Sequence, residues 1–281
     1  MTKAKRGGAS GWLIHPLLIV WALLQLYPIF WLIISSLKPS AEIQAHIFAL
    51  PRSLYLDNYN FGVFNQRGIT IATYLVNSAI VTVASIVILT VVSLLAGYAI
   101  AKLNGPGKNV IIILLVGMLG IPVHSLIIPL YYFIAKVHLL SNFWGLILPY
   151  VAFYLPFSIL LLQTYFRDFP NEIIEAAKID GCNKFRVFSS IVMPVSMGGI
   201  STVLIINFLN VWNEFLFSLV IMKSNAAKTL PVGLMSFRGQ YNVDWGPMLA
   251  AMFLASLPPI VFYLVFHQNI IKGMTAGSLK G

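Results

Sequence analysis

Charged side chains are scarce in this sequence. Asp, Glu, Lys and Arg make up 9% of the 281 residues, whereas hydrophobic residues make up 59%. Because a soluble domain carries roughly 25% charged residues, the composition excludes an ordinary soluble protein. The single cysteine, Cys182, excludes an internal disulfide and leaves the redox compartment open. We therefore read the chain as a membrane protein.

Sequence signatures of nucleotide and metal chemistry are also missing. The stretch NGPGKN (residues 104–109) resembles a Walker A loop only faintly, since it lacks the earlier glycine and a Ser or Thr after Lys108. The five histidines have no metal-ligand spacing. The net charge of +10 is scattered over loops, which argues against nucleic-acid binding. We predict that the chain is no enzyme and binds no cofactor, metal or nucleic acid.

Long apolar runs dominate what is present, and about 20 apolar residues suffice to cross roughly 30 Å of hydrocarbon. We predict an all-α, polytopic membrane bundle of six transmembrane helices. The runs cover residues 12–37, 71–101, 110–135, 143–166, 188–222 and 246–271. Several exceed a perpendicular crossing, which is compatible with tilt, with extension beyond the bilayer, or with breaks at prolines. The prolines in question are Pro122, Pro129, Pro194, Pro258 and Pro259.

Basic residues indicate the orientation of these runs. The segment 1–11 carries Lys3, Lys5 and Arg6, and the run after it is too long for a cleaved signal. With this segment inside, the inside loops hold more Lys and Arg than the outside loops, although the outside loops are longer. We predict that residues 1–11 and 272–281 are both cytoplasmic, and so is the loop 168–187 between the fourth and fifth runs.

This loop, residues 168–187, is unusually polar for its surroundings. Glu172 and Glu175 suit the start of a helix, Ala176 and Ala177 are strong helix formers, and Gly181 ends the helix. A helix of about ten residues is marginal alone in water, so it needs a surface to pack against. The two alanines would let another body approach closely, which favours a docking element. A solvated helix that only joins two spans is the alternative.

The same loop resembles a known motif. Glu175, Ala176 and Ala177, with Gly181 six positions after the glutamate and Ile191 and Pro194 beyond, are similar to the EAA loop of binding-protein-dependent ABC importer permeases. Further stretches resemble the carbohydrate-uptake branch, and in particular the second membrane subunit of maltose-type systems. They are Trp212 to Phe215, Thr229 to Pro231, Asp244 to Gly246 and the closing GMTAGSLKG.

The resemblance implies a permease subunit in a bacterial or archaeal cytoplasmic membrane. It would translocate a sugar or oligosaccharide delivered by an extracytoplasmic solute-binding protein. Its partners would be a second permease subunit, as a heterodimer, and two ATP-binding subunits that use ATP and Mg. The loop 168–187 would couple it to those ATPases through Glu172, Glu175, Ala176, Ala177, Lys178, Asp180, Gly181 and Pro194. An outer loop would meet the binding protein through Arg238, Gly239, Gln240, Tyr241 and Asn242.

Polar residues inside the apolar runs are candidates for a substrate path. A carboxylate in mid-bilayer costs about 3 kcal/mol, which makes Glu214 stand out. Amides can hydrogen-bond sugar hydroxyls and aromatic rings can stack on sugars. The candidates are Asn207, Asn210, Trp212, Asn213, Glu214, Tyr150 and Tyr154. The alternative, which we prefer, is that these groups tie helices together. A different function, an ion-coupled secondary transporter using Glu214, would leave the loop 168–187 without a role.

Overall fold

The computed structural model describes residues 10–64, 70–103, 105–237 and 243–278, and this part of the chain is built from helices. Four described helices are long and apolar enough to cross a membrane, and the number rises to six if each of two sharply bent helix pairs is one span. To that extent the prediction of an all-α membrane bundle is confirmed.

The four long helices coincide with four of the predicted runs. They are α1 (Ser10–Ser36), α4 (Ile71–Lys102), α7 (Trp144–Arg167) and α14 (Trp245–Ser278). Pro258 and Pro259 lie inside α14 without ending it, so the break that they suggested is absent. Prolines are tolerated in membrane helices because neighbouring groups satisfy the freed carbonyls. The helix α4 contains no proline.

The third run is broken where a proline predicted it. The helix α5 (Lys108–Leu119) ends before Pro122, and the short 3₁₀ helix η1 (Val123–Leu126) leads into α6 (Ile127–Lys136). The two arms meet at 87°. Pro129 lies inside α6 and does not interrupt it.

The fifth run is broken twice. It follows directly on α9 (Lys184–Val187), starts as a π-helix, η2 (Phe188–Val192), continues as α10 (Met193–Val195), and bends by 77° before α11 (Met197–Trp212). A second break separates α11 from α12 (Leu216–Ile221). Pro194 lies in α10, two residues before the bend residue Ser196.

The chain divides into two compact units. The first comprises residues 1–71 and 234–255, and its described helices are α1, α2 (Ser40–Ala45), α3 (Asp57–Phe64), the 3₁₀ helix η4 (Leu234–Phe237) and the start of α14. Buried Asn58 ties it together by donating to the carbonyls of Ser36 and Lys38, at 2.8 and 2.7 Å. The Ser40 hydroxyl donates to Asp244 and accepts from the amide of Gly246.

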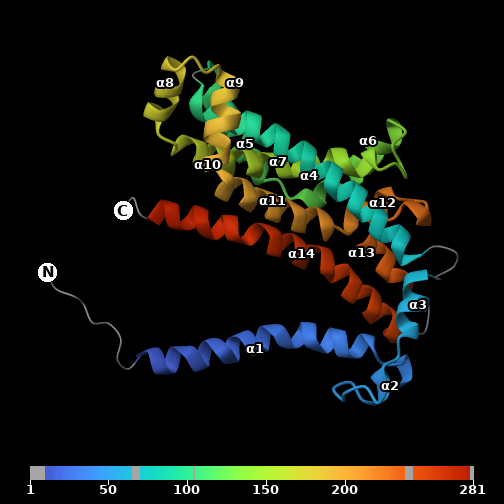
Figure 1. Cartoon of the computed structure of the whole chain (residues 1–281). Coiled ribbons are helices and arrows are strands. Elements are labelled where there is room, and N and C mark those ends of the chain that lie inside the picture. Colours follow the sequence, from blue (N-terminus) through green and yellow to red (C-terminus); the bar gives the residue numbers. More distant parts are fainter. Residues whose placement is uncertain (1–9, 65–69, 104, 238–242, 279–281) are drawn as a thin grey trace. The chain divides into compact units, whose positions relative to one another are not determined.

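The second unit comprises residues 72–233 and 256–281 and contains the rest of the helices. These include α8 (Asn171–Ile179), the 3₁₀ helix η3 (Asn225–Ala227) and α13 (Leu230–Gly233). Figure 1 shows α8 and α9 gathered at one end of α4, with α12 near its other end. Each end of this unit has its own hydrophobic cluster. One lies beneath α8 and the other lies around α7 and α12.

Candidate functional site

The polar loop predicted from the sequence contains a helix, α8, that is anchored by one face. Ile174 and Ala177, three residues apart and thus on one side of the helix, are both buried. They belong to the cluster that includes Phe166, Phe169 and Val187. A nine-residue helix is too short to be stable alone, so these apolar contacts hold it against the ends of the long helices.

The C-terminal end of α8 is a Schellman motif. Gly181 has φ of 82°, the left-handed region in which glycine is favoured. Its amide donates to the carbonyl of Lys178, and the amide of Cys182 donates to the carbonyl of Ala177, each at 3.0 Å. Cys182 packs against the cluster beneath α8, which supplies the apolar contact that usually accompanies this motif. Gly181 therefore ends the helix as the sequence predicted.

The chain then turns into the fifth run through a second cap. The side chain of Asn183 accepts a hydrogen bond of 2.8 Å from the amide of Arg186 and caps α9. Gly181 and Asn183 together fix the direction in which the chain leaves α8.

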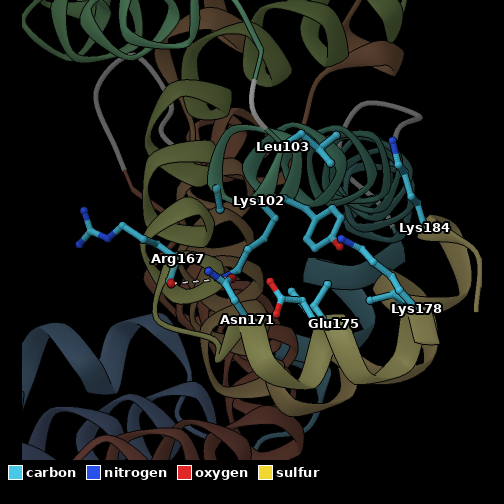
Figure 2. A pocket seen from close by; sticks show the side chains of 11 residues that line it. Lys102, Leu103, Arg167, Asn171, Glu175, Lys178 and Lys184 are labelled. Carbon is cyan, nitrogen blue, oxygen red and sulfur yellow. Dashed lines mark hydrogen bonds between the residues drawn. The ribbon is translucent and has the colours of Figure 1, made fainter. Parts of the chain in front are cut away.

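The N-terminal end of α8 is held by Lys102, the last residue of α4. The Lys102 ammonium donates to the carbonyls of Arg167 and Phe169, at 3.2 and 2.6 Å, and to the Oδ1 of Asn171 at 2.7 Å. Figure 2 shows Lys102 reaching toward Arg167 and Asn171, with Glu175 beside them. One side chain thus joins the end of α4, the end of α7 and the first residue of α8.

A cavity of about 360 Å³ lies between the end of α4, α8 and α9. Its lining includes the cations Lys102, Arg167, Lys178 and Lys184 and one carboxylate, Glu175. Within the described residues the only ion pair joins Arg167 Nε and Asp168 Oδ1 at 3.7 Å, and both side chains are largely exposed. An exposed pair of this kind contributes about 0–1 kcal/mol, so ion pairing does not hold this site together.

Three large apolar side chains are exposed among the charged residues of α8 and α9. Ile179 is 86% exposed and Phe185 is 71% exposed, and Ile173 is also exposed. Ile179 and Phe185 lie on either side of the turn at Gly181. The sequence interpretation included the isoleucines but missed Phe185. Its signal was visible, because it is the only aromatic residue between Asn171 and Val187.

The structure distributes the predicted coupling residues over two faces. Five are exposed, namely Glu172, Glu175, Ala176, Lys178 and Asp180, and so is Gly181 at the turn. Ala177 is buried, so of the two alanines only Ala176 can offer surface to another protein; adjacent helical residues point about 100° apart. Pro194 is exposed but lies in α10, beyond the π-helix.

Glu214, the most prominent polar residue of the predicted substrate path, is buried at the break between α11 and α12. Its carboxylate accepts hydrogen bonds from the Tyr150 hydroxyl at 2.5 Å and from the amides of Phe217 and Ser218 at 2.8 and 3.3 Å. It therefore caps the first turn of α12 and ties α12 to α7. Tyr154 packs against the same cluster as Tyr150.

The other predicted path residues do not converge on Glu214. Buried Asn207 donates to the Ser158 hydroxyl at 2.8 Å and links α11 to α7. Trp212 is buried and stacks on Phe208. Asn210 is exposed, as is Asn213, whose amide donates back to the carbonyl of Leu209. The five residues predicted to meet a binding protein, Arg238 to Asn242, lie outside the described residues.

The chain is similar over nearly its whole length to permease proteins. It is 34% identical to the trehalose transport system permease protein of Mycobacterium tuberculosis, over 97% of this chain and 98% of that protein. It is 31% identical to the diacetylchitobiose uptake system permease protein of Streptomyces coelicolor, over 95% and 88% of the two chains. It is 30% identical to the arabinooligosaccharides transport system permease protein of Bacillus subtilis, over 92% of each.

The fold is similarly shared with a solved structure. A chain of a bacterial ABC transporter involved in the import of the acidic polysaccharide alginate matches with a TM-score of 0.79 and 20% identity, over 95% of this chain and 98% of that one. Residues 90–276 match the family described as binding-protein-dependent transport system inner membrane component. This match covers α8 and both breaks of the fifth run, and the chain therefore belongs to that family of ABC importer permeases.

Proposed function

We propose that this chain is one of two different permease subunits of a sugar importer, and that α8 is its coupling helix. Support comes from the combination of a buried anchoring face, Ile174 and Ala177, with two exposed isoleucines, Ile173 beside that face and Ile179 on the opposite side of the helix. A helix that only joined two spans would gain nothing from exposing Ile179. In this reading α8 seats in an ATP-hydrolysing subunit, one of two, which use ATP and Mg.

The two bent helix pairs count as one span each, which gives six spans. Both termini and α8 then lie on the cytoplasmic side of a bacterial or archaeal membrane, as the distribution of Lys and Arg favours. Closure of the ATPases would move the α8 helices of both permeases and open the path outward, and hydrolysis would reset it.

The transported compound is a sugar or oligosaccharide delivered by an extracytoplasmic binding protein. The names of the relatives, which specify trehalose, diacetylchitobiose and arabinooligosaccharides, support this substrate class. Residues Arg238 to Asn242 remain the proposed contact with the binding protein. Asn210 and Asn213 are the better candidates for lining the path, because their side chains are exposed, whereas Asn207 and Glu214 are buried and bonded to α7.

The ion-coupled alternative has less support. It requires Glu214 to exchange a cation, whereas its carboxylate already accepts three hydrogen bonds inside the bundle. It also leaves exposed Ile179 without a partner. We therefore retain Glu214 as a structural residue in the importer reading.

The test places a charge on the exposed face of α8. Ile179→Asp should leave the chain inserted and paired with the second permease, because the side chain is 86% exposed and contributes little to folding. It should reduce co-purification of the ATPase subunits and binding-protein-stimulated ATP hydrolysis, measured with a panel of trehalose, diacetylchitobiose and arabinooligosaccharides. Gly105→Asp is the control, since it adds the same charge in the turn before α5, where an added Cβ meets nothing within 4 Å.

Wild-type attachment and stimulation in Ile179→Asp would show that α8 is only a connector. Equal losses in both variants would show a general effect of negative charge on this side of the membrane, and would also count against the docking role.

A further inference from the structure

We infer that Lys102 is a positioning residue for coupling: it fixes the start of α8 to the end of α4, so that a displacement of α8 moves α4. The inference rests on the proposed coupling role of α8. It adds a residue that lies outside the loop 168–187, on a different span.

The hydrogen bonds of Lys102 carry the inference. An ammonium has three N–H donors, and Lys102 directs them at three acceptors where the chain passes from α7 to α8. These are the carbonyls of Arg167 and Phe169 and the Oδ1 of Asn171. Cations at the C-terminus of a helix are stabilised by its terminal carbonyls, and here the helix is α7. The lysine is half-buried, and its three hydrogen bonds go to neutral groups, while the nearby carboxylates of Asp168 and Glu172 also attract its charge.

Three connections lead away from α8, and they differ in stiffness. The C-terminal way leads through Gly181, the π-helix η2 and a bend of 77° into α11. Breaks and π-helices are places where a helical span can flex. The N-terminal way leads along residues 168–170 into α7, which contains Pro149 and Pro156. The third connection leads through the Lys102 bonds into α4, which runs for 32 residues without a proline or a break. A displacement at α8 is therefore transmitted with less loss through Lys102.

The apolar packing beneath α8 does not by itself fix the tilt of the helix relative to α4. Ile174 and Ala177 hold the middle of α8 to the hydrophobic cluster, yet the cavity of about 360 Å³ separates much of the helix from the end of α4. Apolar contacts are non-directional and permit a small helix to rock. The Lys102 bonds are directional, so they fix the tilt of α8 relative to α4.

The test uses two substitutions at Lys102 and one control in the assembled importer. Lys102→Met keeps the length of the side chain and removes its donors and charge, whereas Lys102→Arg keeps both charge and donors. Lys108→Met is the control. Lys108 is the first residue of α5, just after the turn that follows Lys102, and it makes none of the three contacts. Two quantities are measured: amide hydrogen exchange over residues 168–175, and the ratio of binding-protein-stimulated to basal ATP hydrolysis with the sugar panel.

We expect faster exchange in Lys102→Met, because the start of α8 opens more often, and a fall of about five-fold or more in the stimulation ratio. Lys102→Arg should retain most of both properties, and Lys108→Met should match the wild type. A Lys102→Met variant with a normal ratio overturns the inference. So does a lower ratio with unchanged exchange, or an equal fall in Lys108→Met.

Failure of this inference is distinguishable from failure of the proposed function. If Ile179→Asp detaches the ATPases while Lys102→Met behaves as wild type, the coupling helix stands and only the role of Lys102 is wrong. If Ile179→Asp has no effect, α8 is not the coupling helix, whatever Lys102 does to exchange.

Discussion

Gly181 and Gly107 offer a matched pair for testing the turn that ends α8. Both have φ of 82°, and at both positions an added Cβ would meet nothing within 4 Å. Gly181 follows α8, and Gly107 caps the start of α5. Gly181→Ala and Gly107→Ala therefore impose the same backbone strain, without a steric clash, at two turns that we propose lie on the same side of the membrane.

The size of the strain follows from the backbone alone. A residue with a Cβ in the left-handed region costs roughly 1–2 kcal/mol. This is small for a bundle of several spans, so both variants should insert and assemble. Each 1.4 kcal/mol nevertheless shifts a local equilibrium about tenfold. At Gly181 the competing conformations give up the bonds from Gly181 to Lys178 and from Cys182 to Ala177, which set the direction of the chain after α8.

The assay compares membrane level, ATPase co-purification and binding-protein-stimulated hydrolysis in the two variants. We expect normal membrane levels in both and loss of attachment or of stimulation only in Gly181→Ala. Wild-type values for Gly181→Ala in all three measurements would refute the reasoning. Matching losses in Gly107→Ala would attribute the effect to strain in any turn of the chain and not to α8.

Two further substitutions test the interior of the second unit. Glu214→Gln should lower the free energy of unfolding by about 1–3 kcal/mol, because the amide cannot accept hydrogen bonds from Tyr150, Phe217 and Ser218 at once. We expect an unchanged sugar preference, and a changed preference would place Glu214 on the substrate path. Gly199→Ala should destabilise the bundle by about 1–3 kcal/mol, since its Cβ would overlap the ring of Tyr165. Gly117→Ala, where the Cβ meets nothing within 4 Å, is its control in the same thermal unfolding measurement, and equal stability of the two variants would contradict the packing argument.

Local sequence chemistry predicted α8 well. Its helix formers, its acidic first turn and the glycine after it act over a few residues, so each could be recognised from spacing alone. Lys102 could not be found in this way, because its partners lie 65 to 69 positions away along the chain. From the sequence it was only one of the basic residues that indicate orientation.

The breaks of the spans were predictable only in part. Pro122 marks a true break and the pair Pro258–Pro259 does not, because a proline in a membrane helix bends it only where the surrounding groups allow. The break at residues 213–215 has no proline at all. Glu214 stabilises it by capping α12, and this role needs the Tyr150 hydroxyl from another helix as well as the local amides.

The exposed apolar side chains of α8 and α9 give an energetic reason to expect a partner there. Fully burying an Ile or a Phe contributes about 1.5–3 kcal/mol, and both Ile179 and Phe185 leave most of that unrealised in the chain alone. Both flank the Schellman turn, whose two hydrogen bonds set the direction of the chain between them. A cleft that covered both would gain several kcal/mol while touching few other residues. Attachment of the ATPase would then depend on apolar contact, whereas transmission of its movement would depend on the polar bonds of Lys102 behind the helix. Ile179→Asp and Lys102→Met therefore affect different steps, attachment and transmission.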